Sequence, residues 1–208
     1  MKLFYAGGSC ALASHIALHE AGAEFEAVKV DLKAGEQKAP EYLAVNPKGR
    51  VPALVTRRGT LTENPAILHW IAVAFPNAQL APLGDPWAMA QVLSFNVFLG
   101  SSVHPAFAHL FRPGRYADGE AAAEAMKAKV PEQLGEYFGV VEQQLERGPW
   151  VHGEAYTTSD CYLYVFARWL QKPELGPERF PRVKAHLERM QERPAVSRAL
   201  EAEGLTAL

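Results

Sequence analysis

The 208-residue sequence has few of the residues that stabilise small secreted or metal-binding proteins. It contains only two cysteines, Cys10 and Cys161, and they lie far apart, in neither a CxxC pair nor a metal-ligand spacing. This excludes a disulfide framework and indicates a reducing compartment, and we expect no metal site. The net charge is −2, without any block of like charges. A protein without a basic excess is not expected to bind nucleic acid.

Long apolar runs are also missing. The stretch from Val92 to Leu99 is too short to span a bilayer and is interrupted by Ser94 and Asn96. The opening residues, Met1 to Ala6, run directly into a glycine pair and lack the apolar core of a secretion signal. We therefore expect no membrane partner and a cytoplasmic location. Apolar residues make up 49% of the chain and charged residues 21%, as is typical of globular proteins.

The first part of the chain alternates strand and helix patterns. Apolar residues recur with a period of two or with helical spacing, and the segments end at turn formers such as Gly22 and Gly59. The predicted order is a strand at 2–5, a helix at 10–21, a strand at 24–32, an irregular or short helical stretch, a hairpin at 51–55 and 60–62, and a helix from 64 or 65 to 74. This order predicts an α/β domain.

The second part has almost no strand pattern. A linker rich in proline spans residues 76–86. Beyond it, helical periodicity covers four segments, at residues 87–111, 120–147, 158–170 and 180–193. Thr157 and Asp160 have the spacing of a helix N-cap and an acidic first-turn residue. We therefore predict two domains, an α/β domain at 1–78 and an all-helical domain at 86–208.

Cys10 lies where the first strand gives way to the first helix. Backbone N–H groups at a helix start are unpaired and favour an anion, and a thiolate is such an anion. The position therefore predicts a lowered pKa for the Cys10 thiol. The alternative is a small buried residue that fills a gap in the core, and the residues alone support the two readings about equally.

Val51 precedes a proline at the start of a predicted strand. Pro52 cannot donate to a sheet, so the chain before it is not fully paired, and Val51 is held extended. Its N–H and C=O could then pair with an extended peptide. A plain junction between a turn and a strand is the alternative, and the residues alone favour it.

Four segments in this order resemble the glutathione transferase family, and the bacterial beta class most closely. They are Lys2–Tyr5 with Gly8–His15, Tyr42–Leu54, Leu61–Ile67 and Thr157–Tyr162. The resemblance spans essentially the whole chain. It implies a thioredoxin-like N-terminal domain followed by an all-α helical-bundle C-terminal domain, with glutathione as co-substrate.

The resemblance also implies roles for individual residues. Cys10 would lie beside the glutathione sulfur, and His104 would line the same site as a second catalytic residue. The Val51 backbone would pair with the cysteinyl part of glutathione, with Pro52 in the cis form. Either Lys38 or Lys33 would meet the glycine carboxylate. The complete set of implied glutathione contacts is Tyr5, Lys38, Val51, Pro52, Glu63 and Asn64.

The surroundings of these residues refine the expectations. Pro105 removes the hydrogen bond to the carbonyl of Ser101, so the helix that carries His104 should kink there. Asn64 stands where the class usually has serine or glycine, and Ala11 replaces a serine often found after the cysteine. A pocket for the second substrate is expected near Phe107, Phe111, Arg112, Arg115 and Trp169, although two phenylalanines one turn apart on a helix more often belong to the core. Cys161 is expected to be buried and inert.

The predicted activity is transfer of the glutathione thiolate to small electrophiles in detoxification, with possible thiol–disulfide exchange through Cys10. One alternative is a glutathione-dependent isomerase of the maleylacetoacetate type, whose serine-rich first-turn motif is only partly present. Another is a non-catalytic binding protein of the same fold, which the intact Val51, Pro52 and Glu63 argue against. The expected partners are glutathione, a small electrophile and a second copy of the chain in a homodimer.

Overall fold

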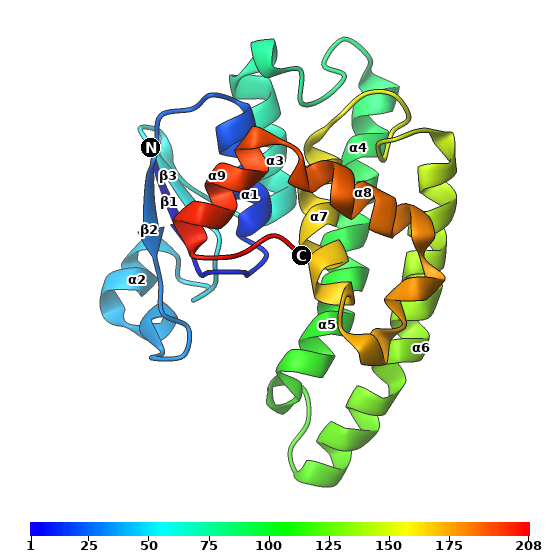
Figure 1. The fold of residues 1–208 in the computed structure, drawn as a ribbon. Coiled ribbons are helices and arrows are strands. Elements are labelled where there is room, and N and C mark those ends of the chain that lie inside the picture. Colours follow the sequence, from blue (N-terminus) through cyan, green and yellow to red (C-terminus); the bar gives the residue numbers. More distant parts are fainter.

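The computed structural model describes all 208 residues, and the chain forms two units joined side by side (Figure 1). One unit holds the sheet and the N-terminal helices. The other is built only from helices. This confirms the predicted fold class, a thioredoxin-like domain followed by a helical bundle.

The sheet has four strands in the order β2-β1-β3-β4. Strand β1 runs parallel to its neighbour β2 and antiparallel to its other neighbour β3. Strands β3 and β4 form the predicted hairpin. Leu3 and Leu54 lie opposite each other on the two central strands and are fully buried. The strands are β1 (Lys2–Tyr5), β2 (Glu26–Lys29), β3 (Ala53–Thr56) and β4 (Gly59–Thr62).

Three helices belong to this unit. They are α1 (Leu12–Glu20), α2 (Pro40–Val45) and α3 (Asn64–Ala74). Helix α1 is apolar almost all round, and every residue from Leu12 to Leu18 is buried. A helix that is buried on all sides needs neighbours on all sides. Helices α3, α7 and α9 supply them, so α1 is held rigidly between the two units.

The helical unit is arranged around α7. Its helices are α4 (Pro86–Phe98), α5 (His104–Phe111), α6 (Glu120–Gln144), α7 (Thr158–Leu170) and α8 (Pro181–Gln191). Helix α7 has the predicted bounds and begins with a capping box, in which the Thr157 hydroxyl accepts from Ser159 N–H and the Asp160 carboxylate accepts from Thr157 N–H. Asp160 also binds Val151 N–H and the His186 ring, so this buried carboxylate fixes the start of the central helix.

The predicted helix over 87–111 is interrupted near its middle. Residues Leu99–Val103 form a π-helical stretch between α4 and α5. Pro105 has no N–H with which to bond the carbonyl of Ser101, so regular α-helical bonding cannot continue through this point. The kink expected at this point corresponds to an irregular stretch, in which the turn is wider than in an α-helix.

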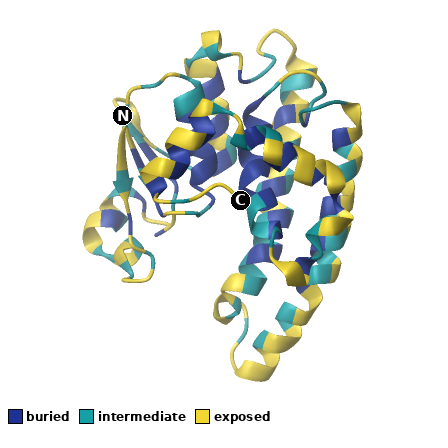
Figure 2. Cartoon of the chain, viewed as in Figure 1, coloured by how far each residue is buried: buried dark blue, intermediate teal, exposed yellow.

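Helix α9 (Pro194–Glu203) was not predicted, because the last segment was interpreted as one helix ending at Arg193. It packs against α1, so residues at the end of the predicted second domain contact the first one. Figure 2 shows buried residues gathered where the units meet, and a single apolar cluster includes both Leu3 and Phe166. None of the helices combines the length and apolar character needed to cross a bilayer.

Candidate functional site

A cleft of about 860 Å³ lies between the two units. One wall is formed by the loop from Ala6 to Cys10 and by Arg50 and Val51. The other is formed by the π-helical turn at Gly100, the start and end of α5, and Trp169 of α7. Cys10, Val51 and His104, which the sequence places far apart, therefore meet in one cleft.

Cys10 lies two residues before α1, and only 7% of its surface is exposed. Its Sγ donates to the carbonyl oxygen of Val51 at 3.5 Å. Burial raises the pKa of the Cys10 thiol to about 12, and the negative charge of Glu63 acts in the same direction. The expected lowering of this pKa is therefore wrong, because desolvation of the thiolate outweighs the helix start and the nearby arginines.

The backbone of Val51 faces the cleft without a partner strand. Strand β3 begins at Ala53, and the Val51 N–H makes no hydrogen bond. Its carbonyl oxygen accepts only the Cys10 thiol. The Val51–Pro52 bond is cis, as the resemblance implied. An extended peptide could therefore pair with Val51 once the thiol gives up its acceptor.

Two residues that the sequence did not single out fix the backbone next to Val51. The Tyr42 hydroxyl and the Asn46 Nδ2 both donate to the Arg50 carbonyl oxygen, each at 2.6 Å. Asn46 Oδ1 also accepts from Lys48 N–H, which closes the turn. The signal was present in the Asn-Pro-Lys-Gly sequence, because asparagine commonly bonds the backbone of its own turn.

Asn64 supports Cys10 through its side chain. Its Nδ2 donates to the Cys10 carbonyl oxygen at 2.7 Å, and its Oδ1 accepts from the Ser14 hydroxyl at 2.6 Å. The side chain is buried and does not line the cleft. The Asn64 side chain therefore positions Cys10, and a contact with glutathione would fall to the backbone N–H groups at the start of α3.

Glu63 precedes α3 with φ of 69°, a left-handed value that is uncommon for a residue other than glycine. Its carboxylate accepts from Lys48 Nζ at 2.6 Å, and both side chains are exposed. Such backbone strain is typical of positions that hold a ligand. Glu63 is not among the residues that line the cleft, but its carboxylate is exposed to solvent and its charge raises the pKa of Cys10, so it lies near the thiol.

Two of the expected contacts are not supported by this geometry. The Tyr5 hydroxyl donates to the Ala202 carbonyl oxygen, and the ring lies against His15, outside the cleft. Lys38 is also absent from the cleft lining, and its Nζ lies over Gly49. Lys33 does line the cleft, so the alternative lysine is the better placed one.

His104 opens α5 and lines the cleft. Its ring lies against Phe166 and Trp169, with centroids 5.7 and 5.5 Å away. Burial lowers the pKa of His104 to about 4, and the positive charges of Arg50, Arg115 and Arg112 lower it further. The imidazole is consequently neutral at pH 7 and can donate or accept one hydrogen bond.

Helix α9 supplies the residue that sequence reasoning missed most completely. The Glu203 carboxylate accepts from Gly8 N–H at 2.9 Å and pairs with His15 Nδ1 at 2.9 Å, with both side chains buried. Trp169 Nε1 donates to the carbonyl oxygen of the same glycine at 3.0 Å. These bonds fix the loop that carries Cys10. No local pattern links Glu203 to Gly8, because they lie at opposite ends of the chain.

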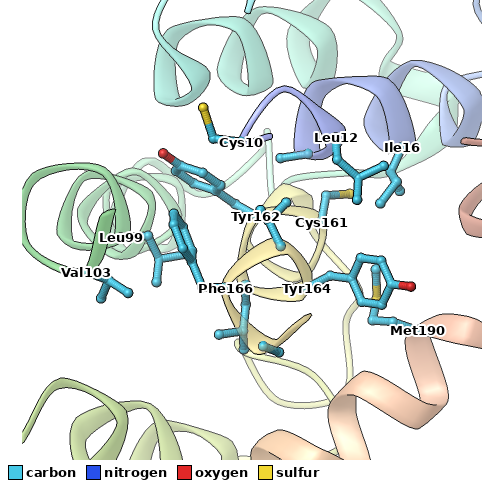
Figure 3. Close-up of a cluster of buried hydrophobic side chains, with 14 of the residues drawn as sticks. Cys10, Leu12, Ile16, Leu99, Val103, Cys161, Tyr162, Tyr164, Phe166 and Met190 are labelled. Carbon is cyan, nitrogen blue, oxygen red and sulfur yellow. The ribbon is translucent and has the colours of Figure 1, made fainter. Parts of the chain in front are cut away.

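The remaining expected residues divide between cleft and core. Phe111, Arg112, Arg115 and Trp169 line the cleft, whereas Phe107 is fully buried. Cys161 is buried under the Tyr156 hydroxyl, and burial raises its pKa, in agreement with an inert thiol. Figure 3 also shows the Tyr162 hydroxyl on the same side of α7 as the Cys10 sulfur, next to Gly100 of the cleft.

Comparison with known proteins gives a consistent family assignment. The models of the glutathione S-transferase N-terminal and C-terminal domains match residues 1–73 and 96–194. Glutathione S-transferase GstA of Escherichia coli O157:H7 is 38% identical over 99% of this chain and 100% of its own length. A glutathione transferase homologue from Sulfitobacter, solved with bound glutathione, is 37% identical with a TM-score of 0.91, covering 99% of this chain and 98% of that chain. A beta-class enzyme from Sphingomonas chungbukensis is 39% identical with a TM-score of 0.87, covering 99% of this chain and 100% of that chain.

Proposed function

Because this chain belongs to the glutathione S-transferase family and uses glutathione as its co-substrate, we propose that it joins the glutathione thiolate to small electrophiles in the cleft between its two units. The main support for this proposal is the backbone of Val51, which is not paired with any strand and lies beside the Cys10 thiol. The cysteinyl N–H and C=O of glutathione pair with Val51, and this pairing brings the glutathione sulfur next to Cys10.

The two ends of glutathione meet groups of opposite charge. The γ-glutamyl ammonium suits the Glu63 carboxylate, and the γ-glutamyl carboxylate suits the free N–H groups at the start of α3. At the other end, Lys33 is the favoured partner of the glycine carboxylate, because it lines the cleft and Lys38 does not.

The reactive species in this proposal is the glutathione thiolate. A free thiol is only about 3% ionised at pH 7, so its anion must be stabilised. The cleft offers hydrogen-bond donors for this purpose in the protonated Cys10 thiol and the neutral His104 ring. The positive charges of Arg50 and Arg112 act on the same place.

Thiol–disulfide exchange through Cys10 is the lesser activity in this proposal. Burial raises the pKa of Cys10 to about 12, so the Cys10 thiolate is scarce at pH 7. Exchange requires the thiolate as nucleophile, so the free protein holds Cys10 in its unreactive form. In conjugation, Cys10 therefore acts as a hydrogen-bond donor to the glutathione sulfur and forms part of the lining of the site.

The two alternatives are not favoured. The close relatives carry the glutathione S-transferase name, not that of the isomerase. A non-catalytic binding protein has no need for donors gathered around the sulfur position. The proposal further includes a cytoplasmic location and a role in detoxification.

We include a homodimer in the same proposal. Several large apolar side chains are exposed along α3 and α4, and Trp87 is the most open of them, at 74%. Leu93 and Val97 lie one turn apart on α4, and Val73 of α3 is exposed as well. Exposed apolar side chains gathered on two neighbouring helices are typical of an interface between subunits.

The proposed function is tested by following conjugation of glutathione to chlorodinitrobenzene, with retention on immobilised glutathione as an independent assay. We expect both. Retention without turnover would favour a binding protein, and failure of both would contradict the proposal.

A further inference from the structure

The charge of the cleft lining is strongly unbalanced. Six cationic side chains line the cleft, against two carboxylates, Asp31 and Glu203. Both carboxylates are already occupied, because Asp31 accepts from two backbone N–H groups of its own turn and Glu203 binds Gly8 N–H and His15. The cations are Lys29, Lys33, Arg50, Arg112, Arg115 and Lys172. A cleft with this excess attracts an anion.

Three of the cations are arginines without any ionic partner. Arg50, Arg112 and Arg115 take part in none of the ion pairs of the protein, whereas Arg193 is paired with Glu20. They are close enough to repel one another. Burial lowers the pKa of Arg115, and the charges of Arg112 and Arg50 lower it further. An anion that enters between them would relieve this repulsion.

Glutathione accounts for only part of this excess. Its glycine carboxylate is expected near Lys33 on the wall of the sheet unit, and its γ-glutamyl carboxylate at the start of α3. Arg112 and Arg115 belong to the opposite wall, at the end of α5 and in the following 3-10 turn. Their guanidinium groups are therefore left for the second substrate.

The surface beside these two arginines is aromatic. Phe111 is 41% exposed, and its ring lies edge-on to Trp169 with centroids 5.6 Å apart. His104 continues the same wall against Trp169. Lys172 Nζ lies 5.6 Å from the centre of the Phe111 ring. The helical wall thus offers aromatic rings together with guanidinium groups in one cleft, a combination suited to an aromatic or conjugated body that carries a carboxylate.

We propose that the electrophile of this enzyme is an anionic one, a planar conjugated or aromatic carboxylate whose body lies on Phe111 and Trp169 and whose carboxylate pairs with Arg112 and Arg115. This inference rests on the proposed function and specifies its substrate class. In an aromatic substitution, the glutathione thiol releases its proton to solvent and its sulfur forms a bond to the ring carbon that bears chlorine. The carbon–chlorine bond then breaks, and chloride leaves with the bonding electron pair.

The test compares a chlorodinitrobenzoate with the neutral carboxamide of the same ring. The quantity compared is kcat/KM for each electrophile divided by its uncatalysed rate with glutathione, which removes the difference in ring reactivity. We expect the native protein to favour the carboxylate about tenfold, the size expected of partly exposed charged hydrogen bonds. This preference should shrink as salt is added, because salt screens exposed charges.

The decisive variant is Arg112→Gln with Arg115→Gln, which should abolish the preference for the carboxylate. The matched control is Arg57→Gln with Arg58→Gln, an equal loss of charge in the exposed β3–β4 turn, and it should leave the preference unchanged. If the cleft variant instead raises KM for glutathione and keeps the preference, the two arginines bind the co-substrate and the inference is wrong.

Binding separates this inference from the proposed function. The dissociation constants of the two preformed glutathione conjugates, measured by calorimetry, do not depend on turnover. Tighter binding of the carboxylate conjugate, lost in the cleft variant and kept in the control, supports the inference even without catalysis. Equal dissociation constants for the two conjugates would overturn it, whether or not the protein is active.

Discussion

The sulfur of Cys10 and the carbonyl oxygen of Val51 lie 3.5 Å apart on one wall of the cleft, joined by a thiol hydrogen bond. The same carbonyl is the acceptor that an added peptide strand would use. The thiol therefore occupies a position that glutathione must take over, and the two residues form one binding element although 40 residues separate them along the chain. The pKa of Cys10 is raised by the burial of its thiol, and the edge at Val51 is open because strand β3 begins only at Ala53.

Cys10 should react slowly with iodoacetamide at neutral pH. Burial raises its pKa to about 12, so its thiolate is scarce at pH 7. As long as the pH stays below this pKa, each rise of one pH unit increases the thiolate about tenfold. Allowing for the greater nucleophilicity of a more basic thiolate, we expect alkylation roughly a hundredfold slower than that of free glutathione. Mass spectrometry of the alkylated protein as a function of pH measures this. The Cys10→Ser variant reports the background from Cys161, and rapid alkylation of the native protein with an inflection below about pH 8 would contradict the raised pKa.

Glu63→Gln should weaken the binding of glutathione about tenfold, because it removes the negative charge proposed to meet the γ-glutamyl ammonium. Isothermal titration calorimetry measures the dissociation constant directly. Glu24→Gln is the matched control, since Glu24 is exposed and makes no ion pair or side-chain hydrogen bond. If the Glu63→Gln variant binds glutathione as tightly as the control does, Glu63 does not contact glutathione.

Glu203→Ala should destabilise the protein and loosen the loop of Cys10. The substitution leaves His15 buried without its partner and Gly8 N–H without an acceptor. Breaking a buried pair in this way costs about 3–5 kcal/mol, which lowers Tm by roughly 6–15 °C for a chain of this size. Thermal unfolding followed by circular dichroism measures it. Glu201→Ala, in the same helix but exposed, should change Tm by no more than about 2 °C, and an equal effect of the two substitutions would refute the role of Glu203.

Trp87→Glu should convert a dimer into monomers, because it places a charge among the exposed apolar side chains of α3 and α4. Light scattering coupled to gel filtration gives the mass of the particle in solution. Tyr116→Glu is the control, since this exposed aromatic residue lies on the rim of the cleft, away from α4. A native protein that is monomeric at all concentrations, or a variant that remains dimeric, would count against the proposed interface.

The sequence predicted most of the fold because most of it depends on local patterns. Strand β1 and helix α7 have the predicted bounds, since each combines a clear apolar period with a defined start. Helix α9 was missed because Pro194 was interpreted only as the end of the preceding helix, whereas a proline is equally suited to the first turn of a new one. Its burial against α1 depends on contacts between the two ends of the chain, which no local pattern contains.

The site was predictable in composition but not in its electrostatics. Cys10, Val51 and His104 do line one cleft, as the resemblance implied. The pKa of Cys10 was predicted in the wrong direction because the helix start is visible in the sequence and the burial of the thiol is not. Tyr5 and Asn64 were assigned to the ligand for a similar reason. Asn64 does lie next to Cys10 and Tyr5 lies outside the cleft, and the side-chain hydrogen-bonding groups of both are used by the protein itself.

A crystal structure of the protein soaked with glutathione tests the central claim most directly. We predict that the cysteinyl backbone of the tripeptide pairs with the N–H and C=O of Val51, and that its sulfur lies against Cys10 after the thiol has left the Val51 carbonyl. A structure with glutathione bound elsewhere, or with Val51 still bonded to Cys10 while the tripeptide occupies the cleft, would contradict it.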